Sequence, residues 1–159
     1  MAIGPVQLIV LGFEHPDFHG EIIEELEKLR ESDTVRVIDS LATTLGAYHA
    51  HPSKVVRAVA TDVQDPRAKA SVWGTTHKTL PQLAAFANGA MVRYLDYNDG
   101  YISGKGSGHP SDSIAALLAA AEVAHAGGRD FMLATAISYE IFCRLSDAWD
   151  NKPVGIDHV

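Results

Sequence analysis

Residues 94–112, YLDYNDGYISGKGSGHPSD, combine the residue types that proton-transfer chemistry requires. Asp96 and Asp99 stand three residues apart at the end of an apolar run, so on a helix they can share a face. A glycine-rich loop then leads to His109, just before a second apolar run. An aspartate beside a histidine can fix the tautomer of the imidazole and raise its basicity. Free N–H groups at a helix start over 111–113 would attract a substrate carboxylate.

The same stretch also fits plainer interpretations, because Asp and Gly are common in ordinary turns. A calcium-binding loop is excluded by spacing, since the glycine and the final glutamate of that motif are not at their required positions. A nucleotide phosphate loop is excluded because neither Ser nor Thr follows Lys105. The histidine pairs at 15 and 19 and at 49 and 51 lack the HExxH or cysteine context of a zinc site, so we expect no metal.

Composition narrows the class of protein. The chain has 159 residues, of which 47% are hydrophobic and 21% charged, a mixture that supports one hydrophobic core. Its net charge of −7 argues against a nucleic-acid partner. No apolar run is long enough for a membrane span, and the start lacks the basic region of a signal peptide, so we expect a cytoplasmic protein. Cys143 is the only cysteine, which excludes an internal disulfide and a multi-cysteine metal cluster.

The hydrophobic patterns predict a mainly α-helical fold with a short strand–helix element at the amino end. Most apolar residues recur at helical spacing, whereas the β-branched run near the start is typical of a buried strand. Residues 34–50 combine both patterns, and we predict mainly helix there. The predicted elements are a strand over 6–13, helices over 19–32, 34–50, 52–63, 81–97, 112–126 and 131–149, and an extended piece at 70–73.

The last two predicted helices are apolar on nearly every side, so we expect them at the centre of the fold. Ser111 or Ser113 should cap the first, Gly127-Gly128 should end it, and Asp130 should begin the second. Because so short a chain cannot cover both helices fully, we also expect exposed apolar surface or self-association. The core face expected for the preceding helix consists of Leu83, Phe86, Ala90, Met91 and Leu95.

Four segments resemble the MmgE/PrpD family in their order and spacing: FANGAMVRYLDYND, GHPSDSIAALLAAAE, AISYEIFCRLSDA and GIDHV. The resemblance covers about residues 38–159. It implies a partial helical domain, followed in complete family members by an α/β domain that would lie beyond residue 159. It also implies a hydro-lyase of the 2-methylcitrate dehydratase type, acting in propionate catabolism as a homodimer. Such an enzyme eliminates water from a small hydroxy-tricarboxylate without a metal, an iron–sulfur cluster or another cofactor.

Site residues carry over by position. Asp96, His109 and His158 match active-site residues of the family, and the resemblance implies that a histidine transfers the proton while Asp96 orients or supports it. Gly100 stands where the family usually has threonine. Arg93 fits a substrate clamp and a salt bridge equally well. The residues expected to bind substrate are Arg93, Lys105, Ser111 and Ser113.

The two ends of the chain depart from the family pattern. Residues 1–40 resemble a small uncharacterised bacterial α/β family, so we divide the chain into a segment 1–37 and a partial helical domain 38–159. The lysines and the later histidine of the family's site come from segments not found here, so we expect weak or no activity from this chain alone. The alternative is a non-enzymatic remnant that acts only through self-association. The exact substrate stays open.

Overall fold

A computed structural model describes residues 33–63, 65–150 and 153. The strand predicted over 6–13, the helix predicted over 19–32 and His158 lie outside the described residues. The prediction of a mainly helical fold is confirmed. The described part holds the helices α2 (Asp33–Ala47), α3 (His51–Thr61), α4 (Pro81–Tyr94), α5 (Ile114–Ala124) and α6 (Gly128–Ala148).

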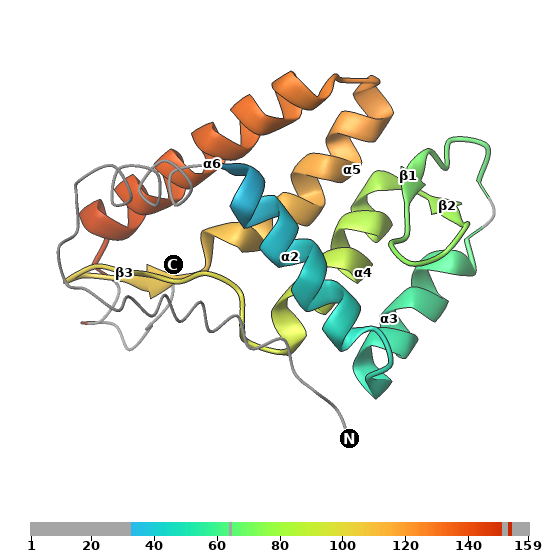
Figure 1. The fold of residues 1–159 in the computed structure, drawn as a ribbon, viewed down its shortest axis with the longest axis horizontal. Helices are drawn as coiled ribbons and strands as arrows, with labels where there is room; N and C mark the ends of the chain where they lie inside the picture. The colour runs from blue at the N-terminus through green and yellow to red at the C-terminus, as the bar shows by residue number, and fades with distance from the viewer. Residues whose placement is uncertain (1–32, 64, 151–152, 154–159) are drawn as a thin grey trace, which may run out of the picture.

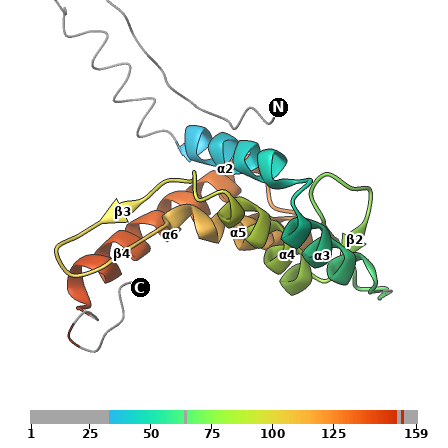
Figure 2. The same ribbon diagram turned by 90° about the horizontal axis from the view of Figure 1, so that it is seen from below.

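Helix α4 lies at the centre of the described part and packs against α2, α3 and α5 (Figure 1). Helices α5 and α6 follow each other as an antiparallel pair, joined by a short turn (Figure 1). Seen from below, α3 to α6 form a layer, and α2 lies across one side of it (Figure 2). Proline in the first turn of both α3 and α4 supplies the fixed φ angle that favours a helix start.

Two short antiparallel hairpins connect the helices. Strand β1 (Ala70–Ser71) pairs with β2 (Lys78–Thr79), in agreement with the extended piece predicted at 70–73. Strand β3 (Tyr101–Ile102) pairs with β4 (Ser107–Gly108) and leads into a 3₁₀ turn over Pro110–Ser113. The β3–β4 hairpin is fastened to α6 by two bonds, in which Tyr101 donates to Asp147 at 3.0 Å and Ser103 donates to the main chain of Ser146 at 2.8 Å.

The buried face of α4 differs from the predicted one. Phe86 is 54% exposed, whereas Ala84, Ala87 and Asn88 are almost fully buried beside Met91. Small side chains let β1 and α5 approach α4 closely, and Ala70, Ala84 and Ala119 meet there in one cluster. Met91 is buried as predicted, but close packing places alanines beside it in the core and leaves the predicted Phe86 exposed.

The ends of the last two helices also need correction. Helix α5 ends at Ala124, and His125 caps it in the left-handed region with a φ of 54°, before Gly127-Gly128 is reached. Gly127 is instead the N-cap of α6, which begins earlier than the predicted Asp130. Ser113 is the N-cap of α5 but makes no capping bond, because its hydroxyl donates to the carbonyl of Pro110 at 2.8 Å.

Helix α6 does not lie at the centre of the described part. Its buried positions are Thr135, Tyr139 and Ser146, while a row of apolar residues at four-residue spacing stays exposed. The helix carries apolar residues on more than one side, and the described residues pack against one of its faces only. The prediction of exposed apolar surface is therefore confirmed for this helix. The exposed row, called the α6 stripe below, consists of Leu133, Ile137, Ile141, Leu145 and Trp149.

Candidate functional site

The end of α4 and the start of the 3₁₀ turn bring two of the predicted catalytic residues together. Asp96 lies just past α4 with a φ of 55°, in the left-handed region that commonly ends a helix. Aspartate is one of the few side chains that tolerate this conformation, so the turn aims a carboxylate where a glycine would be expected. His109 returns from the β3–β4 hairpin, and its Nε2 lies 3.8 Å from Asp96 Oδ1.

The hydrogen bond of His109 Nδ1 determines which tautomer the imidazole adopts. Nδ1 lies 2.6 Å from the main-chain oxygen of Asp99, and a carbonyl oxygen can only accept a hydrogen bond. Nδ1 therefore carries the proton, and in the neutral ring the lone pair is on Nε2. His109 thus has the tautomer of a general base whose free nitrogen is on the side of Asp96.

Arg93 links two carboxylates beside this histidine. Its guanidinium pairs with Asp96 through Nη1 and lies 3.8 Å from Asp112 Oδ2 through Nε. Of the two interpretations of Arg93 left open by the sequence, the salt bridge is present in this structure. A guanidinium that is 37% exposed can also exchange one of these partners for a ligand carboxylate.

A pocket of about 350 Å³ opens next to these groups. This volume is near the lower end of the range for small-molecule sites. His109 and Arg93 supply its polar atoms together with Asp112 and Ser113, and the Phe142 ring of α6 supplies an apolar wall. A base, a cation and an apolar wall around one pocket can hold and deprotonate a small carboxylate.

Two of the three N–H groups expected to receive a substrate carboxylate are occupied. The N–H of Ser111 donates to Asp99 Oδ1 at 3.1 Å, and the N–H of Asp112 donates to the carbonyl of His109 at 3.0 Å. The Ser111 side chain is buried and accepts a bond from the Asn98 amide at 2.9 Å. A carboxylate of the chain itself therefore takes the place that sequence reasoning gave to the substrate.

Of the other two residues expected to bind substrate, one lines the pocket and one does not. Ser113 lines the pocket. Lys105 is exposed in the turn between β3 and β4, where its N–H donates to the Ser103 hydroxyl at 3.1 Å, and it is not a lining residue of the pocket. His158 lies outside the described residues. Gly100 is exposed, and a side chain there would meet open space.

Two residues that shape the site, Asp99 and Tyr139, were not among the predicted site residues. Asp99 bonds to both His109 and Ser111, and Tyr139 from α6 is buried nearby. Burial raises the pKa of the Tyr139 phenol far above its usual range, and the Asp99 carboxylate raises it further. The sequence signal for Asp99 was its three-residue spacing from Asp96, while Tyr139 gave none because it lies within an apolar helix.

The site is strongly acidic. Burial raises the pKa of Asp112, and Arg93 offsets only part of this rise. Burial also raises the pKa of Asp39 on α2, with a further contribution from Asp99. Both shifts mean that removal from water makes the charged forms of these carboxylates less favourable. A polycarboxylate ligand would meet this negative field as well as Arg93.

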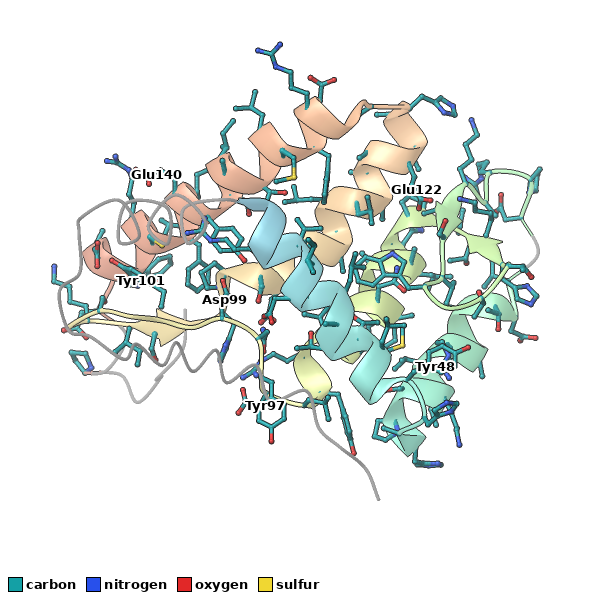
Figure 3. The ribbon with its side chains drawn as sticks, viewed as in Figure 1. Tyr48, Tyr97, Asp99, Tyr101, Glu122 and Glu140 are labelled. Carbon is teal, nitrogen blue, oxygen red and sulfur yellow. The ribbon has the colours of Figure 1, made fainter. Side chains whose placement is uncertain are left out.

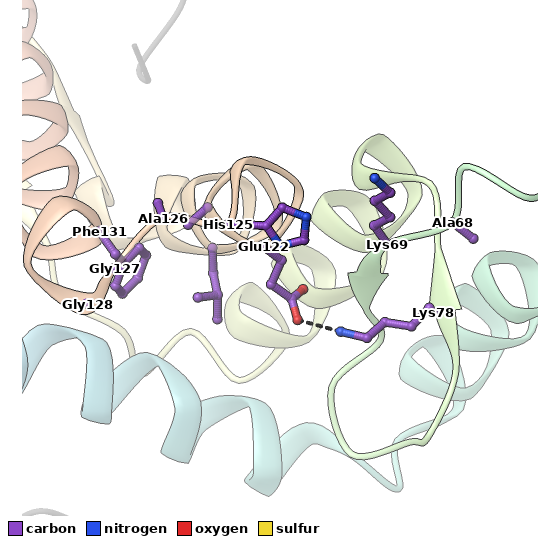
Figure 4. A pocket seen from close by; sticks show the side chains of 11 residues that line it. Ala68, Lys69, Lys78, Glu122, His125, Ala126, Gly127, Gly128 and Phe131 are labelled. Atoms are coloured by element: carbon purple, nitrogen blue, oxygen red, sulfur yellow. Dashed lines mark hydrogen bonds and ion pairs between the residues drawn. The ribbon is translucent and has the colours of Figure 1, made fainter.

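A larger pocket, of about 860 Å³, lies on the opposite side, between the β1–β2 hairpin and the α5–α6 turn (Figure 4). Its lysine at position 78 is engaged by Glu122 at 2.8 Å, as the dashed line in Figure 4 marks. Lys69 and His125 border it but are exposed. Figure 3 shows the separation, with Glu122 on this side and Asp99 beside the β3–β4 hairpin. The smaller pocket holds the better-placed base, so we assign the candidate site there.

Two general findings concern the described residues as a whole. None of their helices is both long and apolar enough to cross a membrane. Within the same ranges, no group of three or more His, Cys, Asp or Glu side chains is arranged to hold a metal ion.

The sequence of this chain is similar to a known domain family and to several known proteins. The MmgE/PrpD N-terminal domain matches residues 20–159. A 2-methylcitrate dehydratase of Salmonella typhimurium is 33% identical over 119 residues, which are 67% of this chain and 24% of that protein. The 2-methylcitrate dehydratase of Cupriavidus necator is 45% identical over 53 residues, 33% of this chain and 11% of that protein. A probable 2-methylcitrate dehydratase of Saccharomyces cerevisiae is 41% identical over 51 residues, 32% of this chain and 10% of that protein.

These matches set the scope of what can be transferred. The chain matches no more than 24% of the length of these three relatives, so their whole activity is not carried over with the family. The domain match begins at residue 20, and α2 runs without a break across residues 37 and 38. The division of the chain at residue 38 stays a prediction. With the domain match extending over most of its length, the chain belongs to the MmgE/PrpD family.

Proposed function

We propose that this chain carries the proton-transfer part of a hydro-lyase site that eliminates water from a hydroxy-tricarboxylate such as 2-methylcitrate. The observation that carries the proposal is the state of His109, whose Nδ1 is held by a carbonyl oxygen at 2.6 Å so that Nε2 is the basic nitrogen. The relatives from Salmonella typhimurium and Cupriavidus necator support the reaction type, because both are named 2-methylcitrate dehydratase.

In the proposed step, His109 Nε2 takes the proton next to a substrate carboxylate. The electrons of the broken C–H bond form the new double bond, and the C–O bond to the hydroxyl breaks. The departing hydroxide must gain a proton to leave as water, and we propose His158, which matches a site histidine of the family, for this second transfer. Asp96 Oδ1, at 3.8 Å from Nε2, would stabilise the imidazolium that forms on His109.

Arg93 is the residue we propose to receive one substrate carboxylate, by exchange with Asp96 or Asp112. One guanidinium cannot balance the charges of a tricarboxylate, and desolvating unpaired charges is costly. We therefore propose that this chain alone is a poor catalyst and that further cations complete the site in longer family members. A homodimeric state, a cytoplasmic location and a place in propionate catabolism are parts of the same proposal.

The test is to incubate the purified chain with 2-methylcitrate and to follow the unsaturated product by ultraviolet absorbance. We expect slow turnover that His109→Ala reduces by about 10²–10⁴-fold, the usual contribution of a general base. His77→Ala, which removes an exposed histidine, is the matched control and should leave the rate unchanged. Ring signals of His109 in NMR spectra should also shift when 2-methylcitrate is added.

Two results would contradict the proposal in different ways. If neither turnover nor a shift of the His109 signals occurs with any hydroxy-tricarboxylate, the pocket is not a substrate site. If the chain turns over 2-methylcitrate as fast as a full-length relative, the proposal that the site is incomplete is wrong.

A second candidate function is self-association without catalysis, and the α6 stripe supports it. Each residue of the stripe is at least 45% exposed, and its four members within α6 form one ridge along the helix, with Trp149 just past the helix end. A ridge of this kind can bury itself against a second copy of the chain. Light scattering should show a dimer that Ile137→Glu with Ile141→Glu disrupts, whereas Val55→Glu on α3 should not. A compact monomer that binds no hydrophobic dye would exclude this function.

A further inference from the structure

Asp99, just before the β3–β4 hairpin, accepts two hydrogen bonds from residues just after it. The main-chain oxygen of Asp99 accepts from His109 Nδ1 at 2.6 Å, and its carboxylate Oδ1 accepts from the N–H of Ser111 at 3.1 Å. These two donors are ten and twelve residues further along the chain. Asp99 therefore closes the loop around the β3–β4 hairpin on both sides of Pro110.

We infer that Asp99 is a positioning residue that holds His109 in its Nδ1-protonated tautomer, with Nε2 left free as the base. The carboxylate acts through the main chain, because fixing Ser111 fixes the distance between residue 99 and the histidine ring. With that distance fixed, the Nδ1–H group of His109 stays in hydrogen-bonding range of the Asp99 carbonyl oxygen. The use of His109 as a base rests on the proposed function, but the fixed tautomer is a property of the folded chain.

The surroundings of Asp99 indicate that its carboxylate is more than a convenient turn residue. Ser111 is 1% exposed, so its N–H would be left unpaired in a buried place without this acceptor. The charge of Asp99 also contributes to the raised pKa of both Asp39 and Asp112, so three carboxylates lie close together here.

Tyr139 closes the third side of this arrangement. Its side chain is 6% exposed, and the Arg36 guanidinium lies 4.5 Å from the centre of its ring. Its hydroxyl is buried beside Asp99, whose charge and hydrogen bonding add to the rise that burial causes in the pKa of the phenol. The ring thus links α6 to Arg36 of α2 next to the Asp99 carboxylate.

The experiment reads the tautomer of His109 directly. The whole chain is labelled with ¹⁵N-histidine, and long-range proton–nitrogen spectra are recorded at a pH where imidazole rings are neutral. His109→Gln assigns the signals. In the unchanged chain we expect the Nδ1-protonated tautomer alone for His109, and mixed tautomers for exposed histidines such as His77.

Two substitutions at Asp99 separate positioning from mere folding. Asp99→Ala removes the acceptor for Ser111 and should convert His109 to mixed tautomers like those of His77. Asp99→Asn keeps a side-chain oxygen for the same N–H and should restore the single tautomer. Asp96→Asn is the control, because Asp96 is on the Nε2 side of the ring and its loss should leave the tautomer unchanged. Circular dichroism verifies that each variant is folded.

Several outcomes would overturn the inference. They are an Nε2-protonated His109 in the unchanged chain, or a single Nδ1-protonated tautomer in folded Asp99→Ala. If Asp99→Ala does not fold, the test is the NMR signal of the Ser111 amide proton in Asp99→Asn. Its signal must move upfield when the charged acceptor becomes neutral, and an unmoved signal overturns the inference. No readout needs turnover, so the proposed dehydratase activity can fail while this inference stands, and the reverse.

Discussion

Replacing Glu122 tests how α5 holds the β1–β2 hairpin. The Glu122 carboxylate accepts the N–H of Ser71 at 2.5 Å, the Ser71 hydroxyl, and the Lys78 ammonium at 2.8 Å. All three donors belong to the hairpin, while Glu122 comes from a helix far along the sequence. Its side chain is 25% exposed, so these bonds are only partly screened by water.

The size of the effect follows from the change in bond type. Glu122→Gln keeps the shape of the side chain but removes its charge, so three charge-assisted bonds become ordinary ones or are lost. Bonds to charged groups contribute about 1.5–3 kcal/mol and ordinary ones about 0.5–1.5 kcal/mol. Allowing for the partial exposure, we expect the free energy of unfolding to fall by about 1–3 kcal/mol.

The loss should depend on pH in one direction. Burial acts to raise the pKa of Glu122, but the bonds from Lys78 and Ser71 outweigh it, so the folded pKa lies below the ordinary value of 4.5. A group whose folded pKa is lowered stabilises the fold fully above its unfolded pKa and loses this effect as the pH falls through the folded pKa. The difference between the two proteins should therefore be full at pH 7 and shrink as the pH falls below 4.5.

The measurement is urea unfolding followed by circular dichroism at several pH values. Glu140→Gln is the matched control, because Glu140 pairs with Arg144 one turn along α6 while 61% of its side chain is exposed. This exposed pair should contribute no more than about 0.5 kcal/mol. If the two substitutions have equal effects, or if the effect of Glu122→Gln does not change with pH, the reasoning about Glu122 is wrong.

Two further substitutions test the packing around the hairpins. Asn88 is 1% exposed and bonds two main-chain groups next to β1, at 3.0 and 2.9 Å, so Asn88→Ala should cost about 2–4 kcal/mol in urea unfolding. Gln82→Ala, on the exposed side of the same helix, should stay within about 0.5 kcal/mol of the unchanged chain, and equal losses would contradict the role of Asn88. A methyl group on Gly108 would lie 2.6 Å from the Phe142 ring, so Gly108→Ala should cost about 1–3 kcal/mol. Gly104→Ala meets nothing within 4 Å, and a loss as large as that of Gly108→Ala would refute the steric argument.

The helices were predictable because their signals are local. Proline in the first turn marks the starts of α3 and α4, and apolar residues at helical spacing mark their lengths. The meeting of Asp96 and His109 was predictable for a similar reason. A helix end and a returning hairpin bring together two segments that are close in the sequence.

What could not be predicted depends on contacts between elements. The buried face of α4 is rotated from the predicted one because Ala84 and Ala87 admit close neighbours, which periodicity does not reveal. The occupant of the Ser111 N–H was wrongly expected to be a ligand, because the sequence does not show that the Asp99 carboxylate turns back to it. Likewise, an apolar α6 suggested a central helix, but composition cannot say which faces find partners.

The charges around His109 separate two requirements of the proposed reaction. Proton abstraction needs one basic nitrogen in a fixed tautomer, and the bond from His109 Nδ1 to a carbonyl meets this requirement within the chain. Polycarboxylate binding needs cations in excess of carboxylates. Of the residues that line the pocket, Arg93 carries a permanent positive charge, and it is already engaged by Asp96 and Asp112. A substrate with three carboxylates must displace these partners and add its own repulsion with Asp99 nearby. Hence a site of this kind can hold its base ready before substrate arrives, but it can hold the substrate only when further cations reach the pocket.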